Sequence, residues 1–207
     1  GVDLTVWRGD YPAHVADWGA TPTPSSQVRR HHGMLVRYVD VEPLKHETPM
    51  LTVGVLEGTE TLTGWLAILD TALGGAIRRV FSSGDFRGKL SDELVLYGSG
   101  NTGFRRLLLL GLGQSDRLDW ESVRRMAGRA IRVAERMRLE SLSISLDAFS
   151  DIDATSTAQA AAEGAALAGW KFRELKTDLS TDPPDVTAVD IVGVDDITGV
   201  SRAVETG

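Results

Sequence analysis

Residues 56–113 read LEGTETLTGWLAILDTALGGAIRRVFSSGDFRGKLSDELVLYGSGNTGFRRLLLLGLG, and their apolar spacing and glycines determine the predicted fold. Apolar side chains from Trp65 onward recur every three or four positions, which is typical of one face of a helix. Gly84 stands where such a helix is expected to stop. Gly74 and Gly75 weaken it, because each glycine inside a helix costs about 1 kcal/mol relative to alanine. We therefore expect a single helix that ends before Gly84.

Two β-prone runs follow, over residues 93–97 and 104–110, and the glycine-rich segment GSGNTG at 98–103 joins them. This segment also matches GxGxxG, the turn that binds a dinucleotide where a strand leads into a helix. Here the next residues have the pattern of a strand instead. The sequence therefore favours a hairpin over a nucleotide site.

The end of the second run offers a weak candidate for anion binding. Gly111, Gly113 and Gln114 lie between a predicted strand and a predicted helix, where backbone N–H groups favour an anion. Asp116 and Asp119 stand where the anion would bind. The favoured interpretation is a strand-exit turn whose helix is capped by its own aspartate.

Strands and helices alternate through the rest of the chain. Strands are expected over residues 4–7, 34–41, 50–56, 141–146 and 186–194, and helices over 120–138 and 154–171. This order predicts an α/β fold with a mixed sheet and helices on both of its faces. We expect one domain over residues 1–194, in which 19–47 form an insertion or flap and 178–185 a loop.

The composition is that of an ordinary globular protein: 207 residues, 42% hydrophobic and 25% charged. A formal net charge of −7 disfavours a general binder of nucleic acid. Because the chain has no cysteine, thiolate metal sites, disulfides and cysteine nucleophiles are excluded. The most apolar stretch, residues 62–81, carries Asp70, Arg78 and Arg79, so no membrane span is expected.

Four arginines recur at helical spacing on the predicted helix 120–138, on the side opposite its apolar face: Arg125, Arg129, Arg132 and Arg136. Such a stripe could contact DNA, RNA or an acidic partner. The favoured alternative is a solvated face tied by pairs such as Arg132 with Glu135 or Arg136 with Glu140.

No metal site or catalytic motif is evident. Adjacent His31 and His32 would point to opposite sides of an extended segment, and no carboxylate stands at ligand spacing. The acidic residues at 151–153 and 195–196 occur in turn-like settings that explain them without catalysis. We find no nucleophile elbow, no His-Glu-x-x-His and no phosphate-binding lysine loop.

Six segments in a fixed order resemble the amino-terminal domain of the leucyl aminopeptidase (cytosol aminopeptidase) family. They are VGVLEG (53–58), LTGWLAILDTALGG (62–75), SGDFRGK (83–89), GSGNTGFRRLLLLGLG (98–113), WESVRRMAGRAIRVAERM (120–137) and AQAAAEGAALAGWKFRELKT (158–177). The resemblance implies a macro-domain-like α/β fold in three layers. Residues 195–207 resemble the beginning of the helix that leads to the family's catalytic domain.

The resemblance also implies what lies outside this chain. In the family, two divalent metal ions polarise the peptide carbonyl and activate water, but the metal-binding lysine, aspartates and glutamate have no counterpart here. We therefore expect a non-catalytic domain that partners a catalytic domain in a cytoplasmic hexamer and serves assembly or access to the active site.

Two rival hypotheses remain. A macro-like module could bind ADP-ribose or another phosphorylated ligand at the strand ends. Alternatively, the arginine stripe could contact DNA.

Overall fold

The computed structural model describes residues 27–31, 34–98, 100, 102–169 and 184–193. Its strands are β1 (Gln27–His31), β2 (Met34–Asp40), β3 (Leu51–Leu56), β4 (Glu93–Tyr97), β5 (Arg106–Gly113), β6 (Ser141–Ser145) and β7 (Ala188–Gly193). Its helices are α1 (Gly64–Ala72), α2 (Ala76–Ser83), α3 (Trp120–Arg136) and α4 (Ala154–Gly169), with short 3-10 turns at Ser115–Arg117 and Asp147–Phe149.

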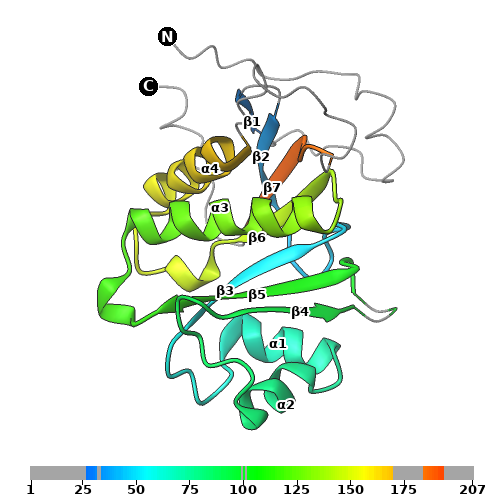
Figure 1. The fold of residues 1–207 in the computed structure, drawn as a ribbon, viewed down its shortest axis with the longest axis vertical. Helices are drawn as coiled ribbons and strands as arrows, with labels where there is room; N and C mark the ends of the chain where they lie inside the picture. The colour runs from blue at the N-terminus through cyan, green and yellow to red at the C-terminus, as the bar shows by residue number, and fades with distance from the viewer. Residues whose placement is uncertain (1–26, 32–33, 99, 101, 170–183, 194–207) are drawn as a thin grey trace, which may run out of the picture.

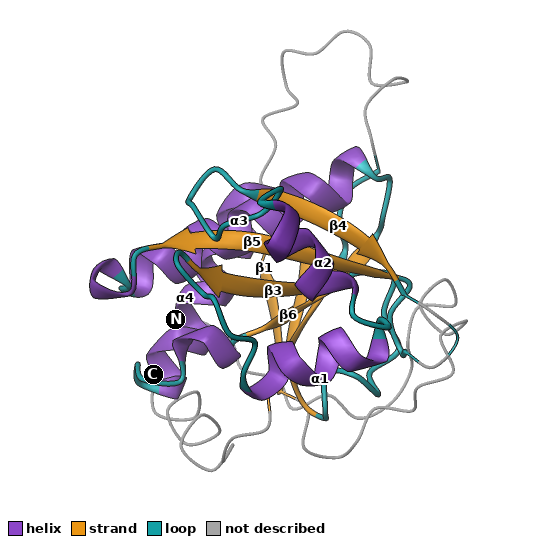
Figure 2. Cartoon of the chain, turned by 90° about the horizontal axis from the view of Figure 1, so that it is seen from below, coloured by secondary structure: helices purple, strands orange, loops and turns teal. Residues whose placement is uncertain are grey.

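The described strands form one sheet in the order β1-β2-β7-β6-β3-β5-β4. The five inner strands, from β2 to β5, pair in parallel, and the two edge strands pair antiparallel. Helices α3 and α4 lie on one face, and α1 and α2 lie on the other (Figures 1 and 2). The predicted mixed sheet with helices on both faces is therefore confirmed.

Helices α3 and α4 pack against each other above the larger part of the core. Small residues allow this approach: a Cβ placed on Gly164 would lie 2.3 Å from the Arg124 carbonyl oxygen. The alanine-rich sequence of α4 therefore reflects close helix packing, as expected. Beneath α3, strand β5 supplies Leu108, Leu110 and Leu112 to the same core.

The helix expected between Trp65 and Gly84 is instead two helices, and this prediction was wrong. Gly74 and Gly75 have φ of +61° and +79°, a left-handed conformation that glycine adopts without strain. The Gly75 N–H donates to the Asp70 carbonyl at 2.8 Å, which closes α1, and the chain starts α2 at once in a new direction. Leu69 and Ile77 then both pack in a second hydrophobic core cluster, separate from the one beneath α3 and α4.

Most strand positions are confirmed within two residues, with one informative difference. The hairpin forms as predicted, with β4 antiparallel to β5, but β5 extends to Gly113.

Within the segment 19–47, residues 27–31 and 34–40 belong to the main sheet, since β2 pairs in parallel with β7. The described part of the expected insertion is thus integral to the fold.

Some expectations fall outside the described residues: the strand at 4–7, most of the loop at 178–185, and the linker helix at 195–207. Within the part of the chain that the structure describes, no helix has both the length and the apolar character needed to cross a membrane.

Candidate functional site

A pocket of about 640 Å³ opens at the carboxyl end of β3. Such a volume lies within the range of about 300–1,000 Å³ that is usual for small-ligand sites, and the carboxyl ends of parallel strands are a frequent place for them. Its lining comes from the loop after β3, from α2 and from the segment that leads to β4: Glu57, Gly58, Thr59, Glu60, Thr61, Leu62, Arg78, Phe81, Ser82, Phe86, Arg87 and Lys89.

Aromatic packing forms the apolar part of the pocket. The rings of Phe81 and Phe86 stack with centroids 5.6 Å apart and an interplanar angle of 14°. Phe86 is almost completely buried, so it anchors the segment that carries Arg87 and Lys89. Stacked aromatic pairs contribute stabilisation in addition to that of the apolar area they bury.

The Asp92 carboxylate fixes the backbone of the segment that carries the basic residues Arg87 and Lys89. One of its carboxylate oxygens accepts hydrogen bonds from the backbone N–H groups of Arg87 at 2.8 Å and Lys89 at 3.1 Å. Gly88, between them, has φ of +76°, and a Cβ there would lie 2.2 Å from the Leu56 carbonyl oxygen. The sequence GDFRGKLSD therefore folds as a tight turn that requires glycine at this position.

The weak anion candidates at the end of β5, Gly111, Gly113 and Gln114, are not among the residues that line the pocket. The Gly111 N–H donates to the Asp92 carbonyl at 3.0 Å, and the Gly113 N–H donates to the Gly88 carbonyl at 2.9 Å. Gln114 is exposed at the end of the strand. An anion could use the two glycine amides only by breaking these bonds, which argues against the anion interpretation.

The four arginines of the stripe on α3 differ in their surroundings. Arg125, Arg132 and Arg136 are exposed, and the Arg136 guanidinium pairs with Glu93 of β4 rather than with the expected Glu140. Arg129 is partly buried and donates to the Gly111 carbonyl at 2.9 Å and the Asp92 carbonyl at 2.7 Å. Desolvation by burial lowers the pKa of Arg129. It therefore ties α3 to the sheet and is not part of a solvated face.

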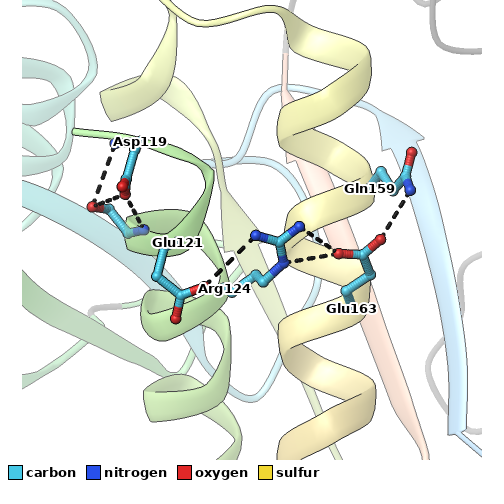
Figure 3. A network of polar contacts seen from close by, with 6 residues as sticks. Asp119, Glu121, Arg124, Gln159 and Glu163 are labelled. Atoms are coloured by element: carbon cyan, nitrogen blue, oxygen red, sulfur yellow. Dashed lines mark hydrogen bonds and ion pairs between the residues drawn. The ribbon is translucent and has the colours of Figure 1, made fainter.

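A polar network links the exposed sides of α3 and α4 (Figure 3). The Arg124 guanidinium donates to Glu163 at 2.8 Å, and Gln159 donates to the other oxygen of that carboxylate at 2.9 Å. Asp119, the predicted cap, accepts from the Ser122 backbone N–H at 2.8 Å in a capping box. The hydrogen bonds from the Ser122 hydroxyl and N–H lower the pKa of Asp119.

A buried ionic cluster missed by the sequence interpretation joins β2, β7 and the loop before β3. Arg37 donates to both carboxylate oxygens of Asp190 at 2.7 Å, and His46 Nε2 lies 2.9 Å from the same carboxylate. A lone aspartate within the apolar run AVDIVG is the signal that could have revealed it, because buried carboxylates are normally paired. The cluster fixes the loop to the sheet.

Within the described residues, no group of three or more His, Asp or Glu side chains is placed to hold a metal ion. The described residues therefore offer no cluster that fits the two divalent metals that the resemblance implies. His32 lies outside the described residues, as do Asp195 and Asp196.

Sequence comparison places this fold in a known family. Residues 52–179 match the Cytosol aminopeptidase family, N-terminal domain. A probable cytosol aminopeptidase of Rippkaea orientalis is 30% identical over 82% of the chain and 35% of its own length. One from Nostoc punctiforme is 29% identical over 77% of the chain and 32% of its length. The chain thus spans about a third of the length of these relatives.

Solved structures show the same fold at low sequence identity. A mutant of tomato leucine aminopeptidase superposes with a TM-score of 0.68 at 20% identity, over 82% of this chain and 34% of that one. A macrodomain of Oceanobacillus iheyensis superposes with a TM-score of 0.62 at 13% identity, over 88% of this chain and 96% of that one. The expected macro-like architecture is therefore confirmed. The match over residues 52–179 covers more than half of this chain. The chain therefore belongs to the Cytosol aminopeptidase family and forms the N-terminal domain of that family.

Proposed function

We propose that this domain serves a longer two-metal aminopeptidase without taking part in its chemistry, by supporting assembly or by restricting access to a catalytic domain. The observation that carries the proposal is the match of residues 52–179 to the N-terminal domain of the family. The whole chain spans only about a third of the length of its relatives. The catalytic metals would then be held by residues beyond this domain.

The use of charged side chains in the described residues supports a structural role. Arg129 fixes α3 to β5, Arg124 bridges α3 and α4, and Arg37 neutralises the buried Asp190. These contacts stabilise the relative positions of the helices and strands that they join. A rigid domain of this kind suits a spacer or an assembly surface.

Hydrolysis of leucine p-nitroanilide tests the proposal. The 207-residue chain and a product extended by a catalytic domain are assayed with added Mn²⁺ or Zn²⁺, and light scattering gives their masses. We expect turnover from the extended product alone, as a hexamer. Metal-dependent turnover by the 207-residue chain, abolished by a chelator, would contradict the proposal.

The two rival hypotheses stay predictions. Macrodomain structures with ADP-ribose or ADP share this fold at 13% identity, which supports a similar architecture and no more. Calorimetry with ADP-ribose tests the first. Salt-dependent binding of duplex DNA, weakened when Arg125 and Arg132 are changed to alanine, tests the second.

A further inference from the structure

The pocket at the end of β3 is lined by acidic residues from one segment and basic residues from another. Glu57 and Glu60 stand on the loop that follows β3, whereas Arg87 and Lys89 stand on the segment beyond α2. We propose that this pocket binds a small zwitterion, a free amino acid or a short unblocked peptide, with its ammonium group toward the glutamates and its carboxylate toward Arg87 and Lys89.

These four charged side chains form no ion pair with one another or with any other residue that the structure describes. By contrast, the Arg78 guanidinium lies 3.4 Å from the buried Asp70 carboxylate. Charges held near one another in a pocket but left unpaired are available to a ligand. A ligand that carries both signs would satisfy both sides at once.

The acidic side of the pocket selects against polyanions. A ligand with two phosphates could place one near Arg87 and Lys89, but it would then share the pocket with the carboxylates of Glu57 and Glu60, which also line it. Like charges brought together in a partly enclosed site reduce affinity. A zwitterion avoids this repulsion, and the Phe81 ring beside it can pack against an apolar side chain.

Backbone contacts hold the two sides in a fixed relationship. The Glu57 N–H donates to the Gly113 carbonyl at 2.8 Å, and the Gly58 N–H donates to the Arg87 carbonyl at 3.4 Å. The acidic and basic segments are thus attached to each other and to β5 at the base of the pocket. Less ordering is then needed on binding, which favours affinity.

Titration calorimetry with leucylleucine on the 207-residue chain tests the proposal, together with N-acetyl-leucylleucine, leucylleucinamide and ADP-ribose. The pocket consists entirely of residues of this chain, so binding can be measured whether or not a catalytic domain follows. Each blocked peptide lacks one charge. We expect each to bind about tenfold more weakly than leucylleucine, because a charge-assisted hydrogen bond is lost. ADP-ribose is expected to bind more weakly still.

Paired variants connect each ligand charge to one side of the pocket. Arg87→Gln combined with Lys89→Gln should weaken leucylleucine about tenfold but leave leucylleucinamide unchanged. Glu57→Gln combined with Glu60→Gln should weaken leucylleucine equally and leave the N-acetyl peptide unchanged. Lys45→Gln, an exposed change outside the pocket lining, is the matched control.

Three results would overturn the proposal: no heat with leucylleucine at millimolar concentration, equal affinity for the blocked peptides, or tighter binding of ADP-ribose that is lost in the Arg87 and Lys89 variant. Circular dichroism of every variant shows whether the fold is retained. Since all four side chains are exposed, their substitution should leave folding intact.

Discussion

The carboxylate of Asp70, near the end of α1, caps the next helix. Its Oδ1 accepts a hydrogen bond from the Arg78 backbone N–H at 2.9 Å, although the two residues are eight positions apart in the sequence. That N–H lies in the first turn of α2, where amides have no partner within their own helix. The Asp70 side chain is buried, and its own carbonyl accepts from the Gly75 N–H. One residue therefore closes α1 and starts α2.

We expect Asp70→Ala to lower the free energy of unfolding by about 2 kcal/mol, since it removes a helix cap and leaves buried polar groups without a partner. Asp70→Asn keeps an acceptor oxygen and should cost less. Urea unfolding followed by circular dichroism measures both, with the exposed Thr71→Ala as control. Equal midpoints for Asp70→Ala and the control would show that this cap is not needed.

The split between α1 and α2 shows where sequence interpretation reached its limit. The apolar spacing on both sides of Gly74 and Gly75 does predict helix, and the two glycines weaken the prediction that this helix is continuous. Their left-handed backbone occurs together with a hydrogen bond from the Arg78 N–H to Asp70, a contact that propensities do not encode. By contrast, the strands could be predicted because continuous apolar runs are typical of buried parallel strands.

The pocket could not be predicted for a different reason. Its acidic and basic residues lie about thirty positions apart in segments without periodicity, and only the folded chain brings them to one strand end. The surroundings of Gly111 and Gly113 show the same limit: the sequence predicts that they follow a strand, but β5 continues through both, and their N–H groups donate to the carbonyls of Asp92 and Gly88.

Arg129 and Arg132 provide a direct comparison within the stripe on α3. Arg129→Ala should destabilise the protein by about 2 kcal/mol. The substitution removes the charged donor from two backbone carbonyls, the buried one of Gly111 and that of Asp92. Arg132→Ala should change stability by less than about 0.5 kcal/mol, since its side chain is exposed. Chemical unfolding of the two variants measures the difference. Similar losses would show that the stripe acts as one unit.

Gly164 and Gly128 test how closely α3 and α4 must approach. Gly164→Ala would place its Cβ 2.3 Å from the Arg124 carbonyl oxygen and should force the helices apart, at a cost of about 1–3 kcal/mol. The new Cβ of Gly128→Ala meets nothing closer than 3.5 Å, so that variant should be neutral or more stable, because alanine favours helix. Thermal unfolding separates them. Equal melting temperatures would contradict the steric argument.

The cap at Asp119 should make part of the stability depend on acid. Hydrogen bonds from Ser122 hold the pKa of Asp119 below its ordinary value of 3.8, so the folded state retains a carboxylate that the unfolded chain protonates more readily. The resulting stabilisation is present above about pH 3.8 and is lost as the pH falls through the folded-state pKa. The effect should be small, because Asp119 is exposed and solvent screens it.

Asp119→Asn isolates this effect, because asparagine is also a good helix cap but does not titrate in this range. Urea unfolding of wild type and variant is compared at pH 7 and pH 3. We expect wild type to be the more stable at pH 7 and the difference to shrink at pH 3. The comparison must be between the two proteins, since Ser156 also lowers the pKa of Asp153 and adds to the acid sensitivity of both. A constant difference between pH 7 and pH 3 would show that the charge on Asp119 contributes nothing to the cap.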